Sequence, residues 1–110
     1  MNPSLKRQLL KTFVQMIDDL KGPKEIETFL TDFFDDNELE KYTRHLATAY
    51  WLKKGRDKDN IRTNLKASSL DLNKANRFLK TQGGKLALNK IEAEEWANQW
   101  AERIKKFTKT

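Results

Sequence analysis

The stretch Asp57–Gly83, with the sequence DKDNIRTNLKASSLDLNKANRFLKTQG, decides the fold of this chain. Apolar residues recur at helical spacing in both of its halves, at Ile61, Leu65, Leu72, Ala75 and Leu79. This periodicity predicts two short helices that share one small apolar core and are separated by the three-residue turn Lys66-Ala67-Ser68. We therefore expect a helix-turn-helix over about residues 58–81.

Positive charge is concentrated around the same stretch, although the chain as a whole has a net charge of only +6. Residues 53–90 hold eleven basic and three acidic residues. Residues 1–52 hold seven and nine, and residues 91–110 hold four of each. A basic segment at a helix-turn-helix indicates phosphate binding, and hence double-stranded DNA as partner, better than a merely solvated face.

The second helix of the motif has a defined start and a polar exposed side. Ser68 and Asp71 stand three residues apart, as in a capping box, which places the helix start at Ser69 or Leu70. In such a motif the first residues of the second helix reach base edges, and flanking cations hold phosphates. The residues expected to contact DNA are Ser68, Ser69, Asp71, Asn73, Lys74, Asn76, Arg77, Lys58, Arg62 and Lys66.

Side-chain chemistry suggests individual roles within this set. Lys74 and Arg77 suit a phosphate or a guanine, and Asn73 suits an adenine edge or a sugar-phosphate oxygen. Further basic residues that would flank the duplex are Lys53, Lys54 and Arg56.

Two features oppose a simple assignment. The turn has no glycine for a left-handed residue, which costs about 1–2 kcal/mol and predicts a distorted turn. The carboxylate of Asp71 is also unfavourable near phosphates. Asp71 therefore either accepts a hydrogen bond from a cytosine amino group or, as we favour, caps its own helix.

The rest of the chain predicts four more helices and no strand, giving an all-α protein with six helices. The first is capped by Ser4 and ended by Gly22-Pro23, the second covers about 24–34, and the third covers 37 to about 54, capped by Asp35 or Asp36 and ended by Gly55. After a loop at 82–88, Asn89 and Glu92 are expected to cap the last helix.

A chain of 110 residues is expected to form one domain, residues 1–110, with a small core. Its two terminal helices nevertheless have wide apolar faces. The residues on these faces are Leu9, Leu10, Phe13, Val14, Ile17 and Leu20 in the first helix, and Ala93, Trp96, Trp100, Ile104 and Phe107 in the last. They can be buried within one chain, but their extent on so short a chain favours a homodimer.

Two segments carry a resemblance to a known family. FLTDFFDDNE at Phe29–Glu38 is similar to the pattern F-L-x-D-L-x-x-x-N-E, and ASSLDLNKANRFL at Ala67–Leu79 is similar to A-S-x-A-T-I-S-R-V-N-R-S-L. Both patterns belong to the Trp-repressor-like branch of the Trp repressor superfamily, which Phe29–Leu79 resembles over about half of the chain. The resemblance implies an intertwined helical homodimer that presents two reading helices to a pseudo-palindromic operator.

The resemblance does not extend to tryptophan sensing. In true Trp repressors, an Arg on the long helix and an Arg, a Gly and a Ser on the reading helix build the indole pocket. The matching positions here are His45, Lys74, Ala75 and Phe78, or Arg44 in place of His45 if the alignment shifts by one residue. Ala75 and Phe78 are expected to fill the pocket, so no small-molecule co-repressor is expected. We interpret His45 itself as a surface or partly buried helix residue.

Composition gives little support to an enzyme. Charged residues make up 35% and hydrophobic residues 37% of the chain, and the mean hydropathy is −0.86. One His, no Cys and no glycine-rich loop after a strand leave no catalytic, metal or cofactor site to predict. The acid pairs at 18–19 and 35–36 are interpreted as capping or solvated groups, and Gly83-Gly84 as a helix stop. Without an apolar run of about 18 residues or a secretory signal, we expect no membrane association and a cytoplasmic location.

The sequence thus predicts a sequence-specific DNA-binding regulator of transcription, most simply a repressor that occupies an operator. The alternative is a helical protein-interaction module, in which Trp96 and Trp100 bind a partner protein and the helix-turn-helix is only scaffold. Asp71 and the missing turn glycine favour that alternative.

Overall fold

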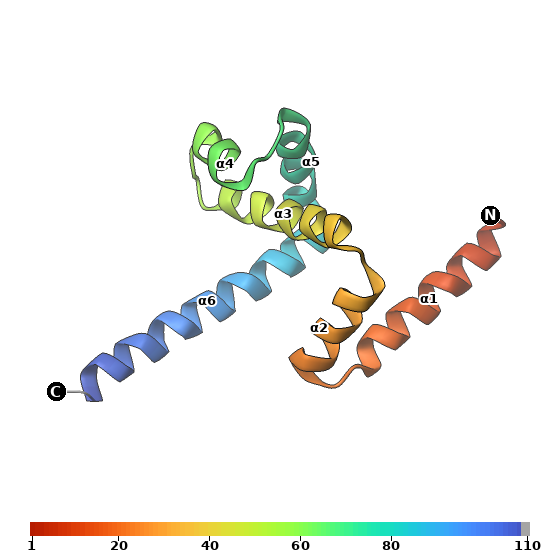
Figure 1. Cartoon of the computed structure of the whole chain (residues 1–110), viewed down its shortest axis with the longest axis horizontal. Coiled ribbons are helices and arrows are strands. Elements are labelled where there is room, and N and C mark those ends of the chain that lie inside the picture. Colours follow the sequence, from red (N-terminus) through yellow and green to blue (C-terminus); the bar gives the residue numbers. More distant parts are fainter. Residues whose placement is uncertain (109–110) are drawn as a thin grey trace. The chain divides into compact units, whose positions relative to one another are not determined.

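The structure is a computed structural model that describes the backbone of residues 1–108 and the side chains of residues 1–95. Over residues 1–108 it consists of six α-helices without a strand, which confirms the predicted all-α class (Figure 1). The helices are α1 (Pro3–Asp19), α2 (Gly22–Phe33), α3 (Asp36–Lys53), α4 (Lys58–Leu65), α5 (Ser69–Lys80) and α6 (Gln82–Thr108). Within the described part of the chain, none of these helices has the length and apolar character needed to cross a bilayer.

The chain divides into two compact units, Met1–Lys41 and Tyr42–Thr110. The first contains α1, α2 and the beginning of α3. The second contains the rest of α3 together with α4, α5 and α6. The predicted helix-turn-helix therefore lies within the second unit.

The start of α1 differs from the prediction, because Asn2 and not Ser4 is the cap. The Asn2 side-chain oxygen accepts hydrogen bonds from the backbone N–H groups of Ser4, at 2.7 Å, and Leu5, at 3.4 Å. Pro3 then opens the helix, where its missing N–H carries no penalty. Ser4 is inside the first turn for this reason.

The junction between α1 and α2 is also shifted from its expected place. The first helix ends at Asp19, and Gly22 and Pro23 form the start of α2. Gly22 has a φ of +75°, a conformation that glycine adopts without steric cost.

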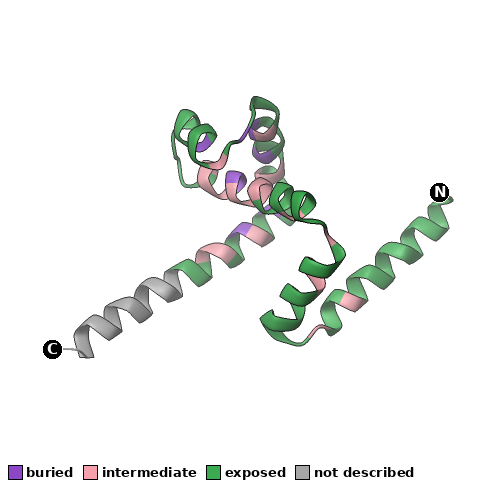
Figure 2. Cartoon of the chain, viewed as in Figure 1, coloured by how far each residue is buried: buried purple, intermediate pink, exposed green. Residues whose placement is uncertain are grey.

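Phenylalanine side chains hold α1 and α2 together. The ring of Phe13 lies 6.1 Å from that of Phe29 and 6.0 Å from that of Phe33, measured between centroids. Phe29 and Phe33 are stacked at 5.1 Å. Neither helix has a fully buried residue, as the green ribbon of Figure 2 shows. The predicted apolar face of α1 is therefore largely uncovered within the first unit itself.

Asp35 is the cap of α3, which decides between the two residues predicted for that role. Its side-chain oxygen accepts from the backbone N–H of Glu38 at 2.8 Å, and the Glu38 carboxylate accepts from the backbone N–H of Asp35 at 3.1 Å. At the other end, Gly55 follows the helix with a φ of +81°. The expected stop at Gly55 is confirmed.

The second unit has two small buried clusters where the sequence predicted one core. Ile61, Ala67 and Leu72 form one of them, with Trp51, Leu52 and Leu65 packed around it. The other consists of Ala49, Ala75 and Leu88, with Leu46, Tyr50, Leu52, Phe78, Leu79 and Ile91 packed around it. The α5 helix contributes to both clusters. Leu72 packs with Ile61 of α4 in the first, and Ala75 packs with Ala49 of α3 and Leu88 of α6 in the second.

The prediction was wrong at the start of α6. Residues 82–88 are helical, so the expected loop is absent and Asn89 and Glu92 lie inside the helix. Thr81 makes the connection instead: its hydroxyl accepts from the N–H of Gly84 and its carbonyl accepts from the N–H of Lys85, both at 3.0 Å. Gly83-Gly84 is consequently the first turn of α6 and not a helix stop.

The reason for a glycine at position 84 is steric. A Cβ atom there would overlap the backbone carbonyl of Phe78, whereas a Cβ at Gly83 would meet open space. The helix α6 can therefore begin one residue after α5 only because Gly84 has no side chain. The predicted apolar positions Trp96, Trp100, Ile104 and Phe107 lie outside the residues whose side chains are described.

Candidate nucleic-acid interface

The turn between α4 and α5 covers residues 66–68, as predicted. Lys66 adopts the left-handed conformation, with φ 54° and ψ 39°, and ends α4. Glycine usually provides this conformation at a helix end. Here a lysine takes it and keeps its side chain exposed, while Ala67 is buried in the adjacent cluster.

The start of α5 is fixed by the predicted capping box. The Ser68 hydroxyl accepts from the backbone N–H of Asp71 at 3.1 Å, and the Asp71 carboxylate accepts from the backbone N–H of Ser68 at 2.9 Å. The helix begins at Ser69, one of the two positions expected. These bonds support the capping role of Asp71 over a contact to cytosine.

Electrostatics around Asp71 agree with that role. Its pKa is lowered chiefly by the backbone hydrogen bond from Ser68, and further by the Ser68 hydroxyl and the charges of Arg44 and His45. Partial burial opposes this effect and raises the pKa. The carboxylate is thus stabilised as an anion within its own helix terminus.

The residues expected to contact DNA are accessible. Asp71 is partly buried, and the other nine are exposed: Lys58, Arg62, Lys66, Ser68, Ser69, Asn73, Lys74, Asn76 and Arg77. On α5, Asn73, Lys74 and Arg77 follow each other at helical spacing and share one side of the helix. The cations of α4 and of the turn belong to the same unit. No carboxylate other than Asp59 and Asp71 lies within residues 58–81.

Arg62 connects the two helices of the motif. Its guanidinium donates to the Ser69 hydroxyl at 3.0 Å, and its other terminal nitrogen lies 3.7 Å from a carboxylate oxygen of Asp59. An α4 cation is thereby held at the first residue of α5. The sequence predicted both Arg62 and Ser69 as contact residues, but not the bond between them.

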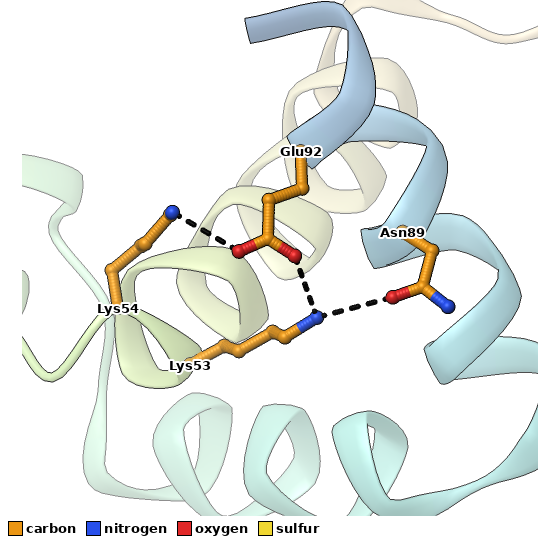
Figure 3. Close-up of polar contacts among 4 residues, drawn as sticks. All are labelled: Lys53, Lys54, Asn89 and Glu92. Carbon is orange, nitrogen blue, oxygen red and sulfur yellow. Dashed lines mark hydrogen bonds and ion pairs between the residues drawn. The ribbon is translucent and has the colours of Figure 1, made fainter. Parts of the chain in front are cut away.

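Two of the additional flanking lysines have a protein partner (Figure 3). Glu92 of α6 accepts from Lys53 and from Lys54, each at 3.1 Å, one on either carboxylate oxygen. Lys53 also donates to the Asn89 side chain at 3.3 Å. Hydrogen bonds and charge from Lys54 and Lys53 lower the pKa of Glu92. These lysines therefore fasten α3 to α6, whereas Arg56 lies over the Trp51 ring at 3.9 Å from its centroid.

Two of the positions that the sequence resemblance compared with an indole pocket lie in contact. The His45 ring lies 5.4 Å from the ring of Phe78, and Phe78 also packs against the cluster that contains the buried Ala75. Burial lowers the pKa of His45, the positive charge of Lys74 lowers it further, and Asp71 opposes them. His45 is partly buried, which is one of the two placements expected for it.

Among the described side chains, no three His, Cys, Asp or Glu residues gather as metal ligands. No family model, curated protein or solved structure matches the chain.

Proposed function

We propose that this protein is a sequence-specific DNA-binding regulator of transcription, which represses by occupying an operator as a homodimer. The observation that carries the proposal is the set of exposed cations on α4, the turn and α5, at Lys58, Arg62, Lys66, Lys74 and Arg77. Because DNA carries a phosphate charge about every 1.7 Å of its axis, such a set provides sequence-independent affinity.

The shape of the motif supports a reading role for α5. Its first turn is pinned by the Ser68–Asp71 capping box, so the side chains that follow are held on a rigid element. Asn73, Lys74 and Arg77 are exposed on one side of that helix and carry donors that match base edges or phosphates. The resemblance to the Trp-repressor-like branch supports the same assignment of α5.

The homodimer is supported by the first unit. Leu9, Leu10, Val14 and Ile17 on α1 are between 42% and 63% exposed, although their spacing forms one apolar stripe. Monomeric proteins rarely leave such a contiguous apolar surface in water. A second copy of the chain would cover it and would also supply the second reading helix that a two-fold symmetric operator requires.

The test is fluorescence anisotropy of the purified protein on a labelled random-sequence duplex at increasing salt concentration. If five cations contact phosphates, the slope of log affinity against log salt is about −4 to −5 per subunit. Lys74→Ala and Arg77→Ala are each expected to weaken binding by about 1–3 kcal/mol where the contact is to a base.

Lys24→Ala serves as the matched control, because Lys24 is also an exposed cation but belongs to α2 of the first unit. Its affinity for DNA should equal that of the wild type. An absence of DNA binding at low salt, with the oligomer intact, would reject the proposal and leave the helical interaction module.

A further inference from the structure

One exposed side chain on the proposed DNA-binding surface is apolar. Leu70 is 72% exposed, and apart from Met1 no large hydrophobic side chain in the described part of the chain is more exposed. It is the second residue of α5, immediately after Ser69. The sequence analysis gave Leu70 no role beyond that of a possible first residue of this helix.

The core does not use this leucine. Ala67 and Leu72, on either side of it, fill the cluster with Ile61, and Ala75 fills the other cluster. Leu70 instead stands three, four and seven residues before Asn73, Lys74 and Arg77, so all four share one stripe of the helix. Leu70 is thus the first residue of a stripe whose other members are polar or positively charged.

The position limits what this side chain can contact. Residues near the N-terminus of a reading helix approach base edges in the major groove. A leucine offers nothing to a phosphate or to the donors and acceptors of the bases. The apolar group on that side of a base pair is the C5-methyl group of thymine.

We propose that Leu70 is a specificity-determining residue that packs against the C5-methyl group of one thymine in each half of the operator. The inference rests on the proposed function, since it names the base that the same site would read. Burial of one methyl group is worth about 0.8 kcal/mol. That value corresponds to about a fourfold difference in affinity at that base pair.

The experiment starts from the wild-type protein and a pool of random duplexes, from which bound sequences are selected. In the selected duplex, each thymine is then replaced in turn by deoxyuridine, which lacks only the methyl group. We expect one thymine per half-site at which this replacement weakens wild-type binding about fourfold. Replacements at the other thymines should leave the affinity unchanged.

The variant Leu70→Ala completes the test. Replacement of the critical thymine by deoxyuridine should not change the DNA affinity of Leu70→Ala. The affinity of this variant for the unmodified duplex should already be about fourfold lower than that of the wild type. The fold is expected to remain intact, because the side chain is exposed and alanine favours a helix. Leu86→Ala is the matched control, since Leu86 is 60% exposed on α6 and should retain the full response to deoxyuridine.

The outcomes separate the two proposals. Selection of a defined sequence, with an equal response to deoxyuridine in the wild type and in Leu70→Ala, overturns the role of Leu70 and leaves the DNA-binding function standing. Failure of the wild type to bind any duplex at low salt overturns both.

Discussion

Lys66 is the non-glycine residue with a positive φ in the part of the chain that the structure describes. The missing turn glycine argued against a regular helix-turn-helix, because a side chain in the left-handed region is disfavoured. The structure shows that the backbone takes this conformation despite the cost. The compensation we infer is functional, since a lysine at this turn adds a cation beside the start of α5.

Replacement of Lys66 by glycine is therefore expected to stabilise the fold. Relief of the left-handed strain is worth about 1–2 kcal/mol, and the extra freedom of glycine in the unfolded chain offsets about 0.4–1 kcal/mol of it. Urea denaturation should show a net gain of up to about 1.6 kcal/mol. Lys66→Ala removes the same charge but keeps the Cβ atom, so it should give no such gain. Equal stability of the two variants would contradict the strain argument.

Asp71 should make stability depend on pH. Its pKa is lower in the folded protein than its ordinary value of 3.8. A carboxyl group of this kind contributes its full stabilisation above the unfolded pKa, and the contribution disappears as the pH falls through the lower folded value.

The variant Asp71→Asn keeps an acceptor for the Ser68 N–H but loses the charge. It is expected to be less stable than the wild type by about 0.3–1 kcal/mol at pH 7, with the difference vanishing well below pH 3.8. Denaturation curves of both proteins at several pH values measure this difference in the free energy of unfolding. A difference that stays constant with pH would show that the charge of Asp71 contributes nothing.

At the scale of the elements, the sequence predictions differ most from the structure at the connection between α5 and α6. Two adjacent glycines usually break a helix, and Asn89 with Glu92 has the spacing of a capping box. In the structure, Thr81 caps α6, and Glu92 pairs with Lys53, the last residue of α3, and with Lys54, which follows it. The lysines that form ion pairs with Glu92 are distant from it in the sequence, so no local sequence pattern predicts these pairs.

The two glycines of this connection should respond oppositely to alanine. Gly84→Ala places a Cβ against the Phe78 carbonyl and is expected to destabilise the protein by about 1–3 kcal/mol. Gly83→Ala meets open space within a helix and should stabilise it by about 0.5–1 kcal/mol. Thermal denaturation of both variants measures the contrast. Similar effects of the two substitutions would mean that α6 does not start at Gln82.

At the scale of the whole molecule, the first unit leaves much of its apolar side-chain surface exposed. Four aromatic rings pack together, at Phe13, Phe29, Phe33 and Phe34, yet Phe33 remains 59% exposed. The proposed homodimer would bury this surface and supply the stabilisation that so small a unit lacks.

A charge on the apolar stripe of α1 should therefore dissociate the homodimer. Val14→Asp would bury an unpaired carboxylate in the interface, at a cost of at least about 2 kcal/mol, or about thirtyfold in the dissociation constant. Sedimentation equilibrium measures the dissociation constant of the dimer. Gln8→Asp adds the same charge at an exposed polar position of α1 and should leave the dimer intact. A wild type that stays monomeric at high concentration would reject the homodimer.

The sequence by itself determined the helical class, the turn at 66–68 and the capping box of α5, because these depend on local periodicity and on residues three positions apart. It also placed the ten candidate contact residues on α4, the turn and α5, where all but Asp71 are exposed. Only the tertiary structure decided the division of the core into two clusters, the start of α6, the use of Glu92 by two lysines and the exposure of Leu70. The two clusters, the ion pairs of Glu92 and the exposure of Leu70 depend on which residues distant in the sequence come into contact, and the start of α6 depends on the Thr81 cap and on the close approach of Gly84 to the Phe78 carbonyl. Periodicity along a single helix does not contain that information.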